Sequence, residues 1–186
     1  MTTRKKWEIL LHWLAVLLIN LFILYTGSAL AAKQMPRPAP EFTHQDSDAW
    51  LNSKPLSLDR LRGKVILLDF WTFDCWSCYR SFAWLTSLED KYRDRAFRVI
   101  GIHTPEFEHE RRVARVREKI AGWGLEHPVM IDNDFSYWNA VGARSWPSFY
   151  LVDKKGVIRA SYMGETRIGD DKARAMEQLI DNLLAE

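Results

Sequence analysis

Residues 65–78 read VILLDFWTFDCWSC, and this stretch decides the fold of the chain. Its first seven residues are nearly all apolar, which is typical of a strand buried on both faces of a parallel sheet. Two cysteines, Cys75 and Cys78, come shortly after this run. Apolar side chains then recur at helical spacing, which predicts a helix from Cys75 to about Tyr92. The stretch therefore predicts a strand-to-helix junction with a C-x-x-C pair at the start of the helix.

The rest of the domain alternates strands and helices. Helical spacing of apolar residues predicts helices around 113–123 and 176–184, and the sequence Asp153-Lys154-Lys155-Gly156 predicts a hairpin turn. The other strands that we expect are 98–102, 129–131, 149–152 and 157–163. Parallel crossovers combined with one hairpin predict an α/β fold of three layers with a central mixed sheet.

An uncharged stretch, 9–32, precedes the domain. Its 24 residues are enough to cross a membrane as an apolar helix, and the basic residues 4–6 before it favour export of the domain after it. Small residues at 29 and 31 also fit a signal-peptide cleavage site. We therefore expect 1–32 to be a signal anchor or a signal peptide. Either one places the domain on the periplasmic or other extracytoplasmic side of the inner membrane.

Three alternating prolines come after this stretch at Pro36, Pro38 and Pro40. Proline favours extended backbone and is excluded from helix interiors. The prolines therefore predict a linker over 33–49, which would hold a globular domain of residues 50–186 away from the membrane.

The composition narrows the function to a redox protein. The chain has 186 residues, a formal net charge of +2 and only two cysteines. Charges of both signs are spread along it, which gives no case for a nucleic-acid partner. Two cysteines are too few for a disulfide scaffold or for a four-cysteine zinc site. The pair therefore indicates a redox-active disulfide that works without a metal or another cofactor.

The position of the cysteines gives each one a role. Free N–H groups and the positive end of the helix dipole stabilise an anion at the first turn of a helix. Cys75 is therefore expected to form a thiolate readily and to attack a disulfide of a partner protein. Cys78 lies one helical turn further on, where its sulfur can reach Cys75 and resolve the mixed disulfide.

The segment 68–78 resembles the active-site segment of thioredoxin, and Trp146-Pro147-Ser148-Phe149 resembles the segment that carries the cis-proline of that family. The resemblance covers about residues 50–184. Within the thioredoxin-like superfamily it is strongest for the TlpA/ResA-like group and for the C-terminal thioredoxin-like domain of DipZ-type proteins. The motifs that resemble DipZ-type proteins are 67–72, 101–107 and 131–134. Both groups are usually extracytoplasmic.

The resemblance implies roles for three further residues. Asp69 looks like the buried aspartate that takes the proton of the resolving thiol, Cys78. Its apolar neighbours in the sequence also favour burial, which raises the pKa of a carboxyl group. Pro147 would be the cis-proline, and the backbone at Trp146 would pair with the client chain.

Three features depart from the family pattern and leave the direction of electron flow open. The pair Trp76-Ser77 is neither the Gly-Pro of thioredoxin nor the Pro-His of DsbA-type oxidants, and the bulky Trp76 would contact clients and narrow their range. Ser81 stands where ResA-like proteins carry an active-site glutamate. Asp74 either opposes thiolate formation at Cys75 or caps the following helix.

The favoured function is reduction of disulfides in client proteins, with apocytochrome c as one candidate client. The electrons would come from a membrane donor of the DsbD/CcdA type. An oxidase or isomerase of protein disulfides is the first alternative. A copper chaperone similar to Sco proteins is the second, with His103, His109 and His127 as candidate ligands. Isolated histidines on loops are more often surface residues, which is what we expect of these three.

Overall fold

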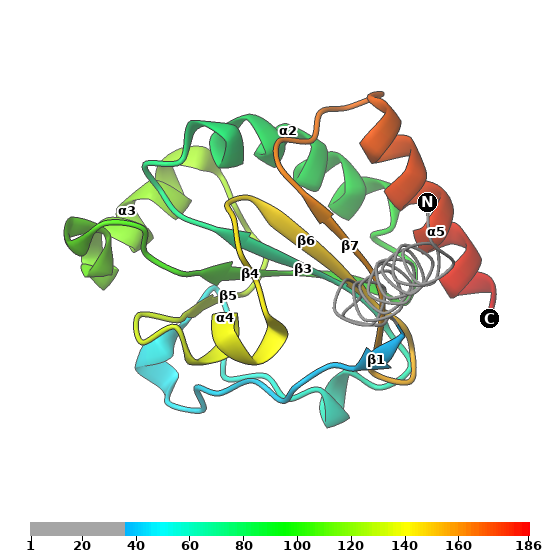
Figure 1. The fold of residues 1–186 in the computed structure, drawn as a ribbon, viewed down its shortest axis with the longest axis horizontal. Coiled ribbons are helices and arrows are strands. Elements are labelled where there is room, and N and C mark those ends of the chain that lie inside the picture. The colour runs from blue at the N-terminus through cyan, green and yellow to red at the C-terminus, as the bar shows by residue number, and fades with distance from the viewer. Residues whose placement is uncertain (1–35) are drawn as a thin grey trace, which may run out of the picture. The chain divides into compact units, whose positions relative to one another are not determined.

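A seven-stranded mixed sheet forms the centre of the structure (Figure 1). The computed structural model describes residues 36–186, and the strands follow the order β1-β7-β6-β3-β4-β5-β2. Their bounds are β1 Arg37–Pro38, β2 Trp50–Leu51, β3 Val65–Trp71, β4 Phe97–His103, β5 Val129–Ile131, β6 Ser148–Val152 and β7 Val157–Met163. The central strand, β3, is parallel to β4 and antiparallel to β6. All of its residues are buried, as predicted for a strand covered on both faces.

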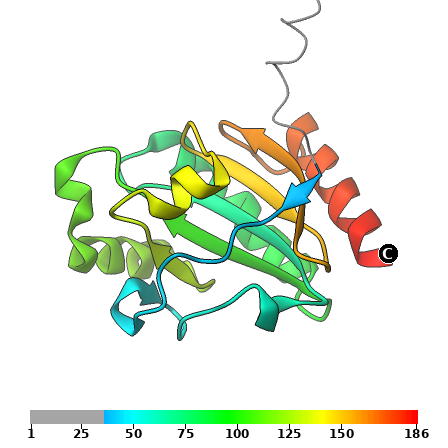
Figure 2. The same cartoon turned by 60° about the horizontal axis from the view of Figure 1, so that its bottom comes forward.

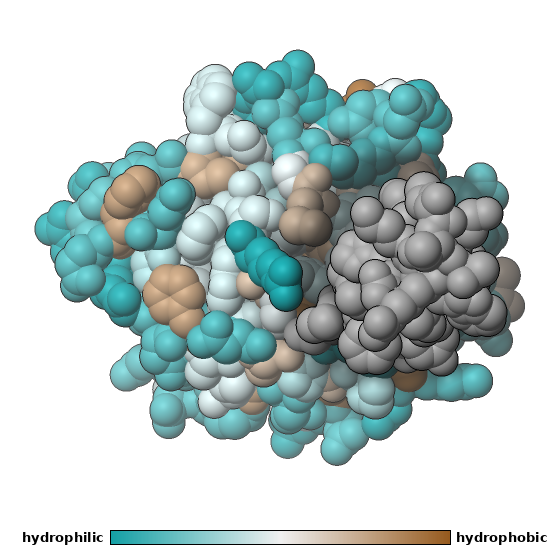
Figure 3. Space-filling model, in the orientation of Figure 1, coloured by the Kyte–Doolittle hydropathy of each residue, from teal (hydrophilic) through white to brown (hydrophobic). Residues whose placement is uncertain are grey.

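Helices cover both faces of this sheet. The α-helices are α2 Trp76–Lys91, α3 Val113–Trp123, α4 Ser136–Val141 and α5 Asp171–Ala185. Short 3-10 helices are η1 Ser47–Ala49, η2 Asp59–Leu61 and η3 Glu108–Arg111. Figure 1 shows α2, α3 and α5 on one side of the sheet and α4 on the other. On the face of the described domain that is turned to the viewer in Figure 3, the hydrophobic residues form small, separate spots.

Alternate residues of β3 divide between the two layers of the core. Leu67 and Trp71 belong to the core cluster that β3 forms with α2, α3 and α5. Phe70 points to the other face, where its ring lies 6.0 Å from Tyr137 and 5.8 Å from Trp138 of α4. This alternation confirms the predicted three-layer α/β architecture with its mixed sheet.

The described part of the predicted linker is not a linker. Arg37 and Pro38 form β1, which pairs with β7 at the edge of the sheet. Phe42 is only 2% exposed, and its ring lies 5.2 Å from that of Tyr137. In Figure 2 this segment runs across the α4 face of the sheet. The compact unit spans 36–186, so the boundary predicted at residue 50 is wrong. Proline favours the extended backbone of an edge strand as well as that of a linker.

Short elements were also missed, because they contain too few residues to show a periodic pattern of apolar side chains. Helix α4 has six residues and depends on tertiary contacts rather than on helical spacing. The Asp132 carboxylate accepts the backbone N–H groups of Tyr137 and Trp138, each at 2.9 Å, and so fixes the start of this helix.

One glycine allows the sheet to pack tightly behind the cysteines. A Cβ atom at Gly101 would lie 2.9 Å from Nε1 of Trp71 and 3.1 Å from Cγ2 of Val129. Any side chain there would therefore displace the indole of Trp71, which contacts Phe82 of α2 at 5.4 Å between ring centroids.

The N-terminal predictions concern residues that the structure does not describe. The apolar stretch 9–32 and the first residues of the predicted linker lie outside 36–186. Within 36–186, no helix combines the length and the apolar character needed to cross a membrane.

Candidate active site

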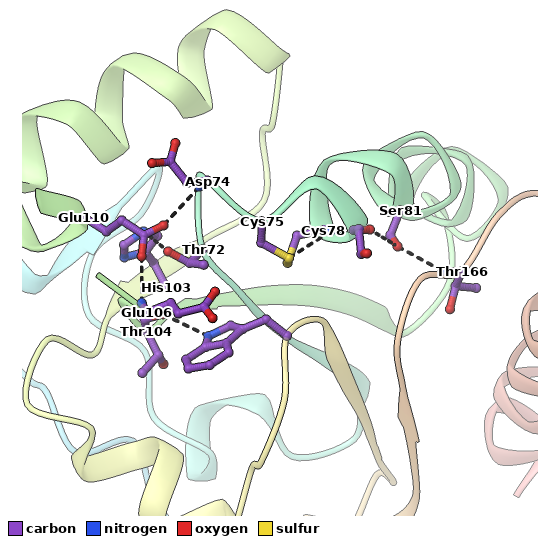
Figure 4. Close-up of a disulfide and its surroundings, with 12 residues drawn as sticks. Thr72, Asp74, Cys75, Cys78, Ser81, His103, Thr104, Glu106, Glu110 and Thr166 are labelled. Atoms are coloured by element: carbon purple, nitrogen blue, oxygen red, sulfur yellow. Dashed lines mark hydrogen bonds between the residues drawn. A yellow bond between two sulfur atoms is a disulfide. The ribbon is translucent and has the colours of Figure 1, made fainter. Parts of the chain in front are cut away.

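The two cysteines form a disulfide at the start of α2 (Figure 4). Their Cα atoms lie 5.2 Å apart. Cys75 is the N-cap residue of the helix, and its Sγ accepts the backbone N–H of Cys78 at 3.1 Å. Cys75 is partly exposed, whereas Cys78 is only 1% exposed. A partner can therefore reach the sulfur of Cys75, which lies where the helix dipole and a free N–H favour a thiolate.

Asp69 lies on β3, on the face of the sheet that α2 covers. Because side chains alternate along a strand, it shares this face with Leu67 and Trp71, which pack in the same core as Cys78. The side chain is 1% exposed, and neither carboxylate oxygen has a hydrogen-bond partner among residues 36–186. Burial raises the pKa of Asp69 well above its usual range. The predicted burial of this acid is confirmed, and the protonated form is the one that its surroundings favour.

A second buried carboxyl group, Glu110, was missed by the sequence reasoning. Its Oε1 accepts the N–H of Asp74 at 3.0 Å, and its Oε2 accepts the N–H groups of Glu106 and Phe107, each at 2.7 Å (Figure 4). Burial alone would raise the pKa of Glu110, but these hydrogen bonds and one from the Thr72 hydroxyl lower it. Glu110 thus holds the loop after β4 against the residue that precedes Cys75.

Asp74 does not cap α2, so that interpretation was wrong. Its carboxylate pairs with His109 instead, and both side chains are about half exposed. The residue that caps the helix is Cys75. The carboxylate next to Cys75 therefore faces a histidine.

Two of the three histidines are buried, contrary to the expectation of surface residues. His103 lies under the loop before Cys75, where its Nε2 is 3.4 Å from the Thr72 hydroxyl. Burial lowers the pKa of His103 to about 4, against the opposing effect of Glu110. His127 is also buried, and its Nδ1 lies 3.1 Å from Oε2 of Glu89.

Neither cysteine belongs to a possible metal site in the described part of the chain. The only group of suitable side chains within 36–186 is His44, Asp132 and Asp134. Asp132 is already used to hold the start of α4. None of the histidines proposed as copper ligands belongs to this group.

The loop that carries Pro147 lies next to the cysteine loop. The bond between Trp146 and Pro147 is cis, as predicted. The indole N–H of Trp146 donates to the carbonyl of Thr104 at 2.9 Å, and the ring stacks on Trp138 at 4.3 Å. Thr104 in turn donates its own N–H to the carbonyl of Trp71. These contacts connect the cis-proline loop to the ends of β3 and β4.

Ser81 occupies the position at which an acid was expected by resemblance. Its hydroxyl donates to the carbonyl of Ser77 and accepts the N–H of Thr166, each at 2.9 Å (Figure 4). The side chain is buried, so this position ties α2 to the loop after β7. Nearby, Arg80 donates to Glu165 at 2.8 Å.

Trp76 lies exposed between the two cysteines of the C-x-x-C segment. Trp76 is 64% exposed, and its ring stacks on that of Tyr79 with 5.3 Å between the ring centroids. It therefore presents an apolar surface beside the reactive sulfur, as a client contact requires.

Known proteins match this sequence and geometry. The AhpC/TSA family matches residues 35–161, about two thirds of the chain. The chain belongs to the AhpC/TSA family. Its match to the thiol–disulfide oxidoreductase YkuV of Bacillus subtilis is 26% identical over 153 residues and covers 82% of this chain and 98% of YkuV. The match thus extends over nearly the whole of YkuV.

Longer relatives of the family contain the domain as a part. The Arabidopsis thaliana protein SUPPRESSOR OF QUENCHING 1 is 38% identical over 73% of this chain, and DipZ of Mycobacterium tuberculosis is 38% identical over 62%. The chain matches 13% and 17% of the lengths of these two proteins.

Solved structures agree with the assignment of the fold. A thioredoxin-like protein in its oxidised form has a TM-score of 0.69 and 26% identity, with 82% of this chain and 97% of that chain covered. A DsbE-type thiol:disulfide interchange protein from Chlorobium tepidum has a TM-score of 0.70 at 22% identity, covering 82% and 99%. The described domain therefore has the thioredoxin-like fold.

Proposed function

We propose that this chain reduces disulfides of client proteins on the extracytoplasmic side of the inner membrane. The observation that carries the proposal is the pairing of an accessible sulfur with a buried one. Cys75 can be reached from outside, whereas Cys78 is buried in the same core layer as the unpaired carboxyl group of Asp69. These are the requirements of a nucleophile, a resolving thiol and a base.

The reaction begins from the reduced protein. The Cys75 thiolate attacks a client disulfide, forms a mixed disulfide and releases one client sulfur, which takes up a proton. Asp69 in its ionised form, which is a strong base because burial raises its pKa, takes the proton of Cys78, and the Cys78 thiolate then attacks the sulfur of Cys75. The second client sulfur leaves and is protonated, so the client gains two electrons. The protein is left with the disulfide that the structure contains.

Two carboxylates support the reductive direction. Asp74 directly precedes Cys75, and Glu110 accepts the N–H of Asp74. Negative charge near a thiolate disfavours it, and a less stable reduced form lowers the reduction potential of the pair. Strong oxidants of this fold have the opposite property, since their reduced form is stabilised.

The sequence supports the proposed location and partners. The uncharged stretch 9–32 after basic residues supports export, and so does the resemblance to TlpA/ResA-like and DipZ-type proteins. The electrons would be supplied through a membrane donor of the DsbD/CcdA type, and apocytochrome c is a candidate client. A net charge of +2 gives no support for a nucleic-acid partner.

The reduction potential of the Cys75–Cys78 pair tests the direction. We expect a value below about −200 mV, measured by equilibration with glutathione. A value near that of DsbA, about −120 mV, would reject the reductase and favour the oxidase. A Cys78→Ala variant would trap clients as mixed disulfides, and a Cys75→Ser variant, its matched control, would trap none. Equal trapping by the two variants would contradict the assigned roles.

A further inference from the structure

A groove of about 390 Å³ lies beside the reactive sulfur. Cys75 forms part of its wall, together with side chains from the first turns of α2 and the last turns of α3. Trp146 and Pro147 do not line it. The groove is therefore a surface separate from the cis-proline loop.

The walls of the groove are aromatic. Tyr79 is 44% exposed and lies between two other rings, 5.3 Å from that of Trp76 and 5.5 Å from that of Trp123. Binding is stabilised when an apolar side chain of the partner covers exposed aromatic surface, because that surface is removed from water. The groove therefore fits a large apolar side chain of a bound chain.

The cation that lines the groove itself is Lys119. Nζ of Lys119 is 5.5 Å from the centre of the Trp123 ring and 5.8 Å from that of Phe73. Among residues 36–186, no carboxylate lies within ion-pair distance of Lys119, and the nearest candidate in the groove, Asp74, pairs with His109. The groove therefore has a positive charge that an acidic group of a bound chain can neutralise.

We propose that this groove binds the client segment that adjoins the reactive cysteine, and that it selects an aromatic side chain together with an acidic one. The inference rests on the proposed function, because it assumes that clients form mixed disulfides with Cys75. It adds the chemistry by which clients are chosen. Trp76, Tyr79 and Trp123 contact the aromatic side chain, and Lys119 contacts the carboxylate.

Mixed-disulfide formation with peptides tests the groove. The Cys78→Ala variant of the full chain would react with four peptide disulfides. In each peptide, the residue next to the cysteine on both sides is either Phe or Gly, and the residue after that is either Glu or Gln. Lys119→Gln should slow the Glu peptides about threefold and leave the Gln peptides unchanged. Trp123→Ala should slow the Phe peptides about tenfold, and Trp123→Phe should restore most of the rate.

Two controls separate the outcomes. Lys155→Gln removes an exposed lysine from the hairpin at the opposite end of β6 and should change no rate. Bis(2-hydroxyethyl) disulfide has no side chain for the groove, so its rate reports the reactivity of Cys75 alone. Loss of reaction with this reagent in the parent chain would reject the proposed function. Normal reaction with it, but equal rates for all four peptides, would reject the groove.

Discussion

Asp69 and Glu110 are both buried near the same disulfide, and the structure treats them in opposite ways. Within the described part of the chain, Asp69 has no hydrogen-bond partner for either oxygen, and burial raises its pKa. Glu110 accepts three backbone N–H groups, and these bonds, with one from Thr72, lower its pKa despite burial. The surroundings thus favour a protonated Asp69 and an ionised Glu110.

The difference separates a chemical role from a structural one. A buried carboxyl group without partners destabilises the folded state, so its presence points to a task that needs a movable proton. A buried carboxylate with all its partners fixes the backbone around it. Asp69 is therefore suited to proton transfer with Cys78. Glu110 is suited to a structural role, because its hydrogen bonds orient the residues before Cys75.

The largest effect is expected when Glu110 is removed. Glu110→Ala would leave three backbone N–H groups without their carboxylate acceptor, and we expect a loss of about 3 kcal/mol in the free energy of unfolding. Urea denaturation of the oxidised protein measures it. Glu108→Ala, two residues away with an 88% exposed side chain, should stay within about 0.5 kcal/mol. A similar small loss for both variants would mean that the hydrogen bonds of Glu110 contribute little to the free energy of unfolding.

Removal of the charge at Asp69 is expected to have the opposite sign. Asp69→Asn should stabilise the protein by about 1–2 kcal/mol at pH 7, because an unpaired buried carboxyl group is costly to ionise. The same change should slow resolution of the mixed disulfide about tenfold or more, since Cys78 loses its base. Urea denaturation and stopped-flow reduction of a client measure the two effects. Asp59→Asn, an exposed acid, is the control and should change neither.

The two acids should also differ in how stability depends on pH. Above the ordinary pKa of an aspartate, the unfolded chain loses the proton that folded Asp69 keeps. The contribution of Asp69 to stability therefore falls by about 1.4 kcal/mol per pH unit until its raised pKa is reached. Glu110 has a lowered pKa, so its contribution is complete above the ordinary glutamate pKa and is lost as the pH falls.

Difference curves against each variant isolate these two contributions. The stability of Asp69→Asn minus that of the parent should rise with pH between the ordinary aspartate pKa and the raised pKa of Asp69. The stability of the parent minus that of Glu110→Gln should also rise, but at lower pH, around and below the ordinary glutamate pKa. A flat curve for Asp69→Asn would show that its carboxyl group titrates normally.

The sequence predicted the parts of the site that lie next to one another along the chain. The strand 65–71, the helix after it and the burial of Asp69 all have a local pattern, and the resemblance supplied Pro147. Glu110 could not be found this way, because one of its partners, Asp74, lies 36 residues earlier in the chain. That contact exists only after β3 and β4 have paired.

The N-terminal segment of the domain was misjudged for a related reason. A linker and an edge strand can both be rich in prolines and polar residues, so composition does not distinguish them. Within this segment, the apolar Phe42 was the residue that indicated burial. Pairing of β1 with β7 joins residues about 120 positions apart, such as Arg37 and Ile158. The short α4 likewise depends on Asp132, which precedes the helix in the sequence but acts through its fixed place after β5.

The smallest effect on stability is expected at the exposed acid, Asp74. Its ion pair with His109 is about half exposed, so Asp74→Asn should change the free energy of unfolding by no more than about 0.5 kcal/mol. The thiolate of Cys75 should nevertheless form at a lower pH, because a neighbouring negative charge is gone. His109→Gln leaves that charge without its partner and should move thiolate formation to higher pH. Thiolate absorbance of the reduced protein near 240 nm measures both shifts. Shifts in the same direction would contradict an effect of the Asp74 charge on Cys75.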